Sequence, residues 1–446
     1  MKNVLIIGAG RSTSSLIKYI CENAESEGWK IKVVDQDLKS AEKAIDYYEE
    51  VASAEHFDAN NEFQMELFVR EADYVISMLP AHMHVPVAKA CLNHCKHLLT
   101  ASYISDEMKE LSNDAKSSGV IFLNEIGVDP GIDHMSAMKV IHDIKEEGGV
   151  MRDFESFTGG LVAPESDNNP WNYKFTWNPR NVVLAGQGGA VKFIQEGQYK
   201  FIPYHRLFRR TEIISIDGYG KFEGYANRDS LKYRSVYGLD DVKTMFRGTL
   251  RRPGFCKAWN LFVQLGVTDD SYILPNTEEM THREFINTFL AYNPNDSVEI
   301  KLRQYLKIDQ DDVDLWEKLE WLGLFERTKI GLKEASPAQV LQHILEKKWK
   351  LEQRDKDMIV MWHKFVYEKD GERKERHSSM VCIGEERPYT AMAKTVGLPL
   401  GIALKLVHRG EIKTPGVHLP ITPEIYLPIL RELEAHGIKF EEKQVN

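Results

Sequence analysis

A short apolar segment that leads directly into a glycine turn opens the chain. Residues 4–7 predict a buried strand, Gly8 and Gly10 form the turn, and residues 14–25 predict a helix. In this context a Gly-x-Gly pattern indicates a dinucleotide site. Gly8 permits the tight turn, Gly10 lets the backbone approach a pyrophosphate, and the helix start supplies free N–H groups. Thr13 replaces the third glycine of the pattern, so we expect the helix to pack farther from the strand or the register to differ.

The alternation of strand and helix continues to about residue 123. Strands that alternate with helices indicate a parallel sheet covered by helices on both faces. The predicted fold class is therefore α/β, with an N-terminal Rossmann domain. The further predicted strands are residues 31–34, 57–58, 73–78, 97–100 and 120–123, and the predicted helices between them are residues 39–48, 62–71, 85–93 and 106–118.

Asp35 ends the second predicted strand, 27 residues after Gly8. A dinucleotide fold places the acid that binds the adenosine ribose near this position. Gln36 and Asp37 follow, without a Lys or Arg for a 2′-phosphate, so we expect NAD to be preferred, with NADP as the alternative. In the other interpretation Asp35 only caps the helix near Ser40. The predicted dinucleotide contacts are Gly8, Ala9, Gly10, Arg11, Asp35, Gln36, Asp58, Ala59, Leu79 and Val128.

A polar segment at residues 124–134 follows the last strand of this series. Its glycines and proline restrict the backbone, so its polar side chains have defined directions. Ligands of α/β sheets bind at the carboxyl ends of the strands, where Ser102 and Tyr103 also lie. We expect this turn to carry catalytic groups. The alternative is an ordinary strand-to-helix turn in which Asp129 or Asp133 caps the helix.

The composition excludes several classes of protein. A net charge of −10 and a pI of about 5.9 argue against nucleic-acid binding, which needs a basic face. Uninterrupted apolar runs stay well below the roughly 20 residues of a membrane span, and the start lacks the pattern of a signal peptide. Five scattered cysteines favour reduced thiols in the cytoplasm. Cys91 and Cys95 are interpreted as residues of a packed helix, and no metal site is expected.

Beyond about residue 154 the pattern changes to strands rich in glycine and aromatic residues, which predicts a mixed sheet. Residues 281–345 predict short, charged helices, and residues 389–404 predict a closely packed helix of apolar and small residues. Arg228 and Arg251 lie inside predicted strands. Because Arg is rarely buried without a partner, each forms an internal ion pair or binds a carboxylate of the ligand. The residues alone leave both alternatives open.

Five motifs in order resemble the saccharopine dehydrogenase (saccharopine reductase) family, in its L-glutamate-forming branch. The resemblance covers essentially the whole chain. It implies an NAD(P)-dependent oxidoreductase of lysine metabolism that converts saccharopine and water to L-glutamate and L-2-aminoadipate 6-semialdehyde, in a biosynthetic or a catabolic direction. The motifs are residues 124–134, 159–165, 225–230, 248–251 and 391–402.

The resemblance also implies three domains and leaves the oligomeric state open between a monomer and a homodimer. The expected domains are a Rossmann domain at 1–128 plus about 387–412, a substrate-binding α/β domain with a mixed sheet at 129–270 plus about 350–386 and 413–446, and an inserted helical subdomain at 271–349.

The family's residue roles correspond to positions already noted. Asp129 resembles its substrate-contacting acid and is the expected acid or base, with Tyr103 as the expected relay; in the alternative, Asp129 only anchors the substrate. The substrate contacts implied by the resemblance are Ser102, Tyr103, Asp129, Arg228, Thr249, Leu250 and Arg251. Two positions depart from fungal members, which carry a cysteine where this chain has Thr158 and a Cys-Arg-Thr run where it has Asp35.

Two other functions remain as alternatives. One is a related amine dehydrogenase, such as a lysine 6-dehydrogenase or a carboxynorspermidine dehydrogenase. A substrate with fewer carboxylates would not need both Arg228 and Arg251. The other is a non-catalytic NAD-binding regulator, which would be expected to have lost Asp129, Tyr103 or the arginines, and all of them are present.

Overall fold

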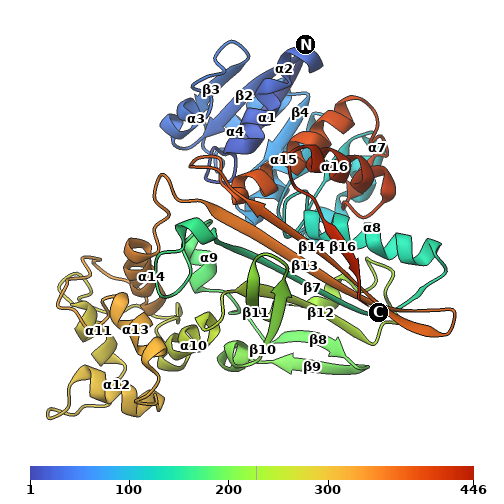
Figure 1. Ribbon diagram of the computed structural model, residues 1–446. Helices are drawn as coiled ribbons and strands as arrows, with labels where there is room; N and C mark the ends of the chain where they lie inside the picture. Colours follow the sequence, from blue (N-terminus) through green and yellow to red (C-terminus); the bar gives the residue numbers. More distant parts are fainter. Residues whose placement is uncertain (228, 446) are drawn as a thin grey trace. The chain divides into compact units, whose positions relative to one another are not determined.

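The computed structural model of the protein describes residues 1–227 and 229–445. They form two compact units, each with its own sheet (Figure 1). The first unit comprises Met1–Val150, Tyr367–Lys374 and Met380–Asn446, and the second comprises Met151–Val366 and Glu375–Ser379. Over these described residues, each helix is too short or too polar to cross a membrane.

The first unit is built on a parallel sheet of seven strands in the order β15-β6-β5-β4-β1-β2-β3. The expected α/β class with an N-terminal Rossmann-like sheet is confirmed. Six strands come from the first part of the chain and one from near its end. Their bounds are β1 (Lys2–Ile7), β2 (Trp29–Asp35), β3 (Ala52–His56), β4 (Tyr74–Ser77), β5 (His97–Thr100), β6 (Ile121–Leu123) and β15 (Gly416–His418).

Helices cover both faces of this sheet. On one face, Leu5 and Ile7 of β1 pack into a buried cluster with Phe68 of α4 and with Val87 and Cys91 of α5. On the other face, α1 packs against α15. The helices of the unit are α1 (Ser14–Glu22), α2 (Ala24–Glu27), α3 (Leu38–Ala44), α4 (Glu62–Glu71), α5 (His84–Asn93), α6 (Asp106–Glu110), α7 (Ser112–Ser117), α8 (Ile132–Glu146), α15 (Ala391–His408) and α16 (Pro423–Ala435), with the 3₁₀ turn η1 (Ala81–Met83).

The contact between α1 and α15 depends on glycine. A Cβ on Gly397 would lie 2.6 Å from the backbone nitrogen of Leu16, and a Cβ on Gly401 would lie 2.5 Å from the ring of Tyr19. The small residues of α15 therefore allow the close helix packing that the sequence predicted. Through this contact α15, from the C-terminal part of the chain, is held against the sheet that the N-terminal strands form.

Several predicted boundaries differ from the structure. The third strand lies at Ala52–His56 rather than at residues 57–58, because it is a polar edge strand without an apolar run. The helix predicted at residues 106–118 is two helices that meet at Leu111. Residues 413–446 group with the first unit and not with the second, since β15 pairs with β6 and α16 packs against α8 and α15.

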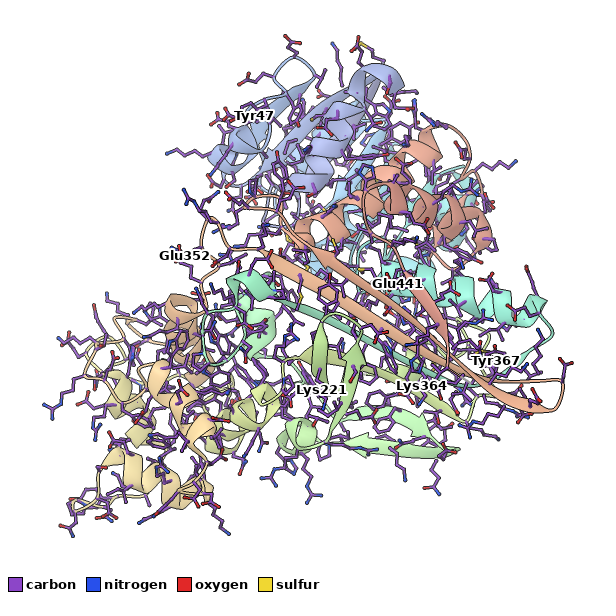
Figure 2. All side chains as sticks on the ribbon, viewed as in Figure 1. Tyr47, Lys221, Glu352, Lys364, Tyr367 and Glu441 are labelled. Carbon is purple, nitrogen blue, oxygen red and sulfur yellow. The ribbon has the colours of Figure 1, made fainter. Side chains whose placement is uncertain are left out.

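The second unit contains the expected mixed sheet, in the order β10-β11-β12-β7-β13-β14. β12 runs parallel to β7 and antiparallel to β11, and the hairpin β8–β9 joins at β12. Lys364 of β13, labelled in Figure 2, reaches Glu155 of β7 at 3.3 Å. The strands are β7 (Val150–Val162), β8 (Val191–Gln195), β9 (Gln198–Ile202), β10 (Thr211–Ile216), β11 (Gly220–Ala226), β12 (Thr244–Arg251), β13 (Asp357–Lys369) and β14 (Glu372–Ile383).

Aromatic side chains form much of the core beside this sheet. The ring of Trp349 lies 5.1 Å from Trp171 and 5.0 Å from Tyr173, and Phe255 stacks on Trp259 at 5.7 Å. The helices of the unit are α9 (Pro179–Val183), α10 (Phe255–Leu265), α11 (His282–Thr288), α12 (Val298–Leu306), α13 (Val313–Trp321) and α14 (Pro337–Lys348). α11 to α14 occupy the segment predicted to be helical.

Candidate active site

The glycine turn after β1 has the conformation expected of a dinucleotide-binding turn. Gly8 has a φ of +105°, which favours glycine. A Cβ on Gly10 would meet no atom within 4 Å among the described residues, so this position is open to a ligand. Thr13 is buried and donates its hydroxyl to the carbonyl of Gly10 at 2.7 Å. The residue that replaces the third glycine therefore braces the turn.

Asp35 contacts the glycine turn directly. Its Oδ2 accepts the N–H of Ala9 at 2.7 Å, and its Oδ1 accepts the N–H of Asp37 at 2.8 Å. The cap of α3 is Asp37, which accepts the N–H of Lys39 at 3.2 Å and the hydroxyl of Ser40 at 2.7 Å. The interpretation of Asp35 as the cap of that helix is therefore wrong. A carboxylate at this place suits the adenosine ribose, and its contact with a dinucleotide stays a prediction.

The other predicted dinucleotide contacts lie at the same edge of the sheet. Asp58 and Ala59 follow β3, Leu79 follows β4 and Val128 follows β6, all after the carboxyl ends of parallel strands. Arg11 is exposed in the turn after β1, which also contains Ala9 and Gly10. Gln36 is exposed in the turn after β2. The residues fit a dinucleotide in two respects: the turn at Gly10 is open, and α1 starts directly behind it.

Tyr103 and Asp129 meet at this edge. The Tyr103 hydroxyl donates a hydrogen bond of 2.7 Å to Oδ1 of Asp129. Tyr103 follows β5 and Asp129 follows β6, and both side chains are half-buried. The structure thus brings together the two residues predicted to act in catalysis. Their catalytic roles remain a prediction.

Hydrogen bonds of buried side chains fix the conformation of the rest of the turn at residues 124–134. Glu125 is fully buried, with a φ of +59°. Its Oε1 accepts the N–H of Ile104 at 2.8 Å, and its Oε2 lies 2.7 Å from Nε2 of His134. Asp133 accepts the N–H of Gly131 at 2.6 Å. These bonds join the loop that carries Tyr103 to the turn that carries Asp129.

Gly131 cannot be replaced without moving the turn. Its φ is +145°, and a Cβ would lie 2.1 Å from the carbonyl oxygen of Gly127. α8 begins immediately afterwards at Ile132. The residue before it is a glycine with no side chain to act as a cap. Neither Asp129 nor Asp133 is therefore the N-cap residue of α8, although Asp133 in its first turn accepts the N–H of Gly131.

Ser102 takes part in a separate buried network. Its Oγ lies 2.8 Å from Nε2 of His84, and its half-buried side chain follows β5. His84 starts α5 and is buried. We did not single out this histidine in the sequence, because a lone histidine at a helix start carries no periodic or spacing signal.

In the second unit, β12 places three polar side chains on one face. Arg247, Thr249 and Arg251 alternate along the strand with Gly248 and Leu250, which belong to the opposite face. Thr249 lies opposite Thr158 of β7. Arg247 was missed in the sequence, although its spacing of two residues from Thr249 places it on this face. Leu250 is fully buried, and its contact with a ligand stays a prediction.

Arg251 is buried among aromatic rings. Its guanidinium carbon lies 5.1 Å from the ring centre of Tyr173, 5.3 Å from Phe255 and 5.8 Å from Tyr225. One guanidinium nitrogen donates to the carbonyl of Leu250 at 2.8 Å. The buried Nε of Arg251 and the hydroxyl of Tyr173 have no partner among the residues that the structure describes. Two buried groups with hydrogen atoms to donate fit an anionic acceptor such as a carboxylate.

The carboxylate opposite Arg251 in the sheet is already engaged. Glu223 pairs with Arg251 in register, and its Oε1 accepts the N–H of Cys256 at the start of α10 at 2.5 Å. Arg228, the other predicted carboxylate ligand, lies outside the described residues. The negative charge of Glu223 also acts on the guanidinium of Arg251, so both alternatives for the arginines remain predictions.

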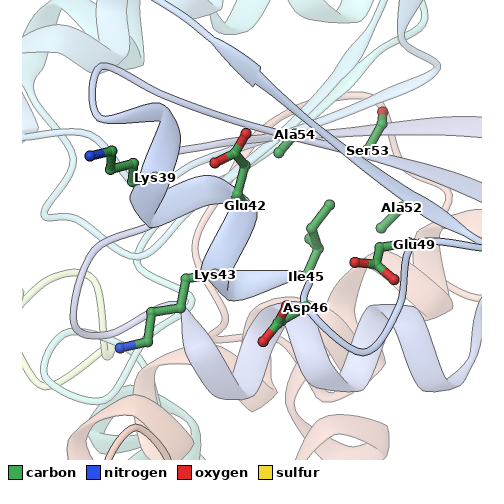
Figure 3. Close-up of a pocket in the computed structure, with 9 residues that line it drawn as sticks. All are labelled: Lys39, Glu42, Lys43, Ile45, Asp46, Glu49, Ala52, Ser53 and Ala54. Atoms are coloured by element: carbon green, nitrogen blue, oxygen red, sulfur yellow. The ribbon is translucent and has the colours of Figure 1, made fainter.

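A surface pocket of about 590 Å³ lies between α3 and the edge strand β3 (Figure 3). Charged side chains of both signs line it, among them Lys39, Lys43, Glu42 and Asp46. It includes none of the predicted site residues. Among the described residues, groups of three His, Cys, Asp or Glu side chains suited to a metal ion are absent.

Comparison with known proteins identifies the family. The profile described as "Saccharopine dehydrogenase NADP binding domain" matches residues 4–123, and that described as "Saccharopine dehydrogenase C-terminal domain" matches residues 127–438. The saccharopine dehydrogenase [NADP(+), L-glutamate-forming] of Schizosaccharomyces pombe is 34% identical over 100% of both chains.

Two further comparisons support the same family. The mitochondrial alpha-aminoadipic semialdehyde synthase of Rattus norvegicus is 33% identical over 98% of this chain, which spans only 47% of that longer protein. The apo structure of the L-Glu-forming saccharopine dehydrogenase of Saccharomyces cerevisiae matches with a TM-score of 0.90 at 31% identity, over 100% of both chains. The chain belongs to the saccharopine dehydrogenase family.

Proposed function

We propose that the protein is an L-glutamate-forming saccharopine dehydrogenase of lysine metabolism. It oxidises the secondary amine of L-saccharopine with a nicotinamide dinucleotide and water, and it releases L-glutamate and L-2-aminoadipate 6-semialdehyde. The observation that carries the proposal is the hydrogen bond between Tyr103 and Asp129, at the same sheet edge as the open glycine turn, in a chain of this family.

Asp129 is the proposed general base. When bound, the dinucleotide accepts the hydride from the carbon that bears the amine. The amine must lose a proton in this step, and a water molecule must later lose one as it attacks the imine carbon. Asp129 takes these protons through its carboxylate, which the Tyr103 hydroxyl orients from Oδ1. A positioned base of this kind contributes roughly 10²–10⁴-fold in rate.

Arg251 and Arg228 are the proposed anchors of substrate carboxylates. Saccharopine has three carboxylates, and charge-assisted hydrogen bonds to such groups contribute about 1.5–3 kcal/mol each. The unsatisfied Nε of Arg251 and hydroxyl of Tyr173 support a carboxylate at this place. Thr249 and Ser102 are further proposed substrate contacts. A lysine-type amine has fewer carboxylates and gains less from this set.

We also propose NAD as the preferred dinucleotide, with NADP as the weaker one. Asp35 would repel a 2′-phosphate, and Lys39, the first cation after it, is exposed in the first turn of α3. The names of the fungal relatives carry NADP(+), so this proposal separates the present protein from them. It rests on the residues at the end of β2.

The preference is tested by measuring kcat/KM with each dinucleotide for the wild type and for Asp35→Ser. The wild type is expected to favour NAD, and the variant is expected to shift towards NADP. Asp46→Ser, at an exposed acid beyond α3, serves as a matched control that leaves the preference unchanged. A wild type that favours NADP would overturn the assignment of Asp35.

The substrate is tested with purified protein, each dinucleotide, and saccharopine, lysine or carboxynorspermidine in turn. The absorbance of the reduced nicotinamide is expected to rise with saccharopine and to stay flat with the other amines. Turnover of lysine or carboxynorspermidine in place of saccharopine would favour the alternative amine dehydrogenase. Dinucleotide binding without turnover of any amine would favour a regulator.

We further propose that the protein acts in the cytoplasm, supported by its five free cysteines. Its partner there is the small-molecule substrate. Light scattering coupled to gel filtration distinguishes a monomer from the homodimer that the family resemblance left open.

A further inference from the structure

A buried histidine joins two strand ends of the first unit. Nδ1 of His84 lies 2.9 Å from the hydroxyl of Ser77, the last residue of β4. Nε2 of His84 lies 2.8 Å from the hydroxyl of Ser102 and 3.0 Å from that of Thr100, the last residue of β5. His84, Ser77 and Thr100 are buried, and Ser102 is half-buried. Ser102 is therefore the one of these four residues that is partly exposed to solvent.

The imidazole of His84 is neutral at neutral pH. Burial and, to a smaller extent, the nearby His82 lower the pKa of His84 to about 4. A neutral imidazole has one N–H and one lone pair, on different nitrogens. The two nitrogens of His84 therefore play opposite roles towards the hydroxyls around them.

The number of hydroxyls on each side favours one tautomer. An N–H on Nε2 can be shared between the oxygens of Ser102 and Thr100, while the lone pair on Nδ1 accepts the hydroxyl of Ser77. In the opposite tautomer a single lone pair on Nε2 would have to accept two hydroxyls. Thr100 also accepts the backbone N–H of Ser102 at 3.3 Å, which is compatible with its oxygen acting as an acceptor.

We propose that His84 is a positioning residue held in the Nε2–H tautomer, and that it makes Ser102 a hydrogen-bond donor to a substrate carboxylate. With its oxygen accepting from His84, the Ser102 hydroxyl directs its proton away from the imidazole. The identity of the acceptor as a carboxylate rests on the proposed function; the tautomer does not. Ser77 lies just before Leu79, a predicted dinucleotide contact. The imidazole of His84 therefore also connects the loop after β4 with the loop after β5, which carries Ser102.

The close contact of Ser102 with His84 has a second interpretation, that of an activated serine nucleophile. In that case Nε2 would have to be unprotonated and would have to take the proton of Ser102. The low pKa of His84 makes it a weak base, and the proposed tautomer already carries a proton on Nε2. The two interpretations therefore differ in a measurable property, the protonation of Nε2.

The first test measures the tautomer in the full chain without ligands. Long-range ¹H–¹⁵N correlation spectra of protein labelled in its histidines distinguish protonated from unprotonated ring nitrogens. The signal of His84 is assigned as the one missing in His84→Gln. We expect Nε2 to be protonated and Nδ1 to be unprotonated at neutral pH. An Nδ1–H tautomer, or a doubly protonated ring, would overturn the proposal.

The second test asks whether His84 acts through Ser102. Ser102→Ala is expected to raise KM for saccharopine roughly tenfold, the loss of one charge-assisted bond, with a smaller change in KM for the dinucleotide. His84→Gln is expected to give a loss of similar size, and the double variant is expected to lose little more than either single variant. Independent, multiplying losses would overturn the coupling.

A matched control lies at the other end of the same strand. His408 contacts the hydroxyl of Tyr74, the first residue of β4, at 3.1 Å. His408→Gln is expected to leave both KM values unchanged. If His84→Gln fails to fold, the signal of His84 is assigned instead as the one that shifts in Ser102→Ala, whose hydroxyl contacts Nε2, so the tautomer is still measured. A wild type inactive on saccharopine with the Nε2–H tautomer would refute the proposed function but not the tautomer.

Discussion

Replacing Asp129 by Asn separates catalysis from substrate anchoring. The amide keeps the size of the carboxylate and still accepts the hydrogen bond that Tyr103 donates at 2.7 Å, but it cannot take a proton. If Asp129 is the base, kcat is expected to fall by roughly 10²–10⁴-fold, with a smaller change in KM for saccharopine. Stopped-flow measurement of reduced nicotinamide at saturating substrate gives the rate.

Tyr103→Phe supplies the second half of the same test. It removes a hydroxyl that donates to the charged form of Asp129. A bond of this kind contributes about 1.5–3 kcal/mol, and the half-buried site favours the lower end because water replaces the donor in part. About 1.4 kcal/mol corresponds to one pH unit. The acidic limb of the kcat–pH profile is therefore expected to move to higher pH.

The outcome that refutes this reasoning is specific. If Asp129→Asn keeps near-normal kcat and only raises KM, Asp129 anchors the substrate and another group is the base. An unchanged acidic limb in Tyr103→Phe would show that the hydrogen bond does not act on the catalytic carboxylate. Asp114→Asn, at an exposed acid of α7, is the matched control and is expected to change neither quantity.

Three further predictions concern stability. Gly397→Ala places a Cβ 2.6 Å from the backbone of Leu16 and is expected to lower the free energy of unfolding by about 1–3 kcal/mol, measured by denaturant titration. Gly131→Ala is expected to abolish turnover and broaden the thermal transition, because its Cβ would overlap the turn. The paired Arg283 lowers the pKa of Glu299 to about 2, so the stability gained from this pair is present above about pH 4.5 and is lost as the pH falls towards 2. Since the side chain of Glu299 is about one-third exposed, at 31%, and solvent screens the pair, the Tm difference between Glu299→Gln and the wild type is expected to be small at neutral pH and to vanish in acid.

Predictions from the sequence were most accurate where local chemistry alone determines the structure. The glycine turn and the acid at the end of β2 follow from backbone geometry and strand order, so Gly8, Gly10 and Asp35 were found correctly at one edge of the sheet. The polar turn at residues 124–134 was recognised because glycine and proline restrict it. The meeting of Tyr103 with Asp129 followed from the rule that neighbouring parallel strands end together.

The sequence predicted least where a contact depends on tertiary structure alone. His84 is defined by three hydroxyls on two strands and a loop, and none of these contacts leaves a periodic trace in the sequence. The strand β3 was misplaced because an exposed edge strand needs little apolar surface. Arg247 was overlooked, although strand alternation from Thr249 would have located it.

The proposed function is tested most directly by identifying and quantifying the products that the enzyme forms. The wild type is incubated with L-saccharopine and NAD, and the reduced nicotinamide, L-glutamate and 2-aminoadipate 6-semialdehyde are quantified by absorbance and mass spectrometry. We predict equal amounts of all three products. Absence of L-glutamate, or formation of lysine and 2-oxoglutarate in its place, would contradict the proposed function.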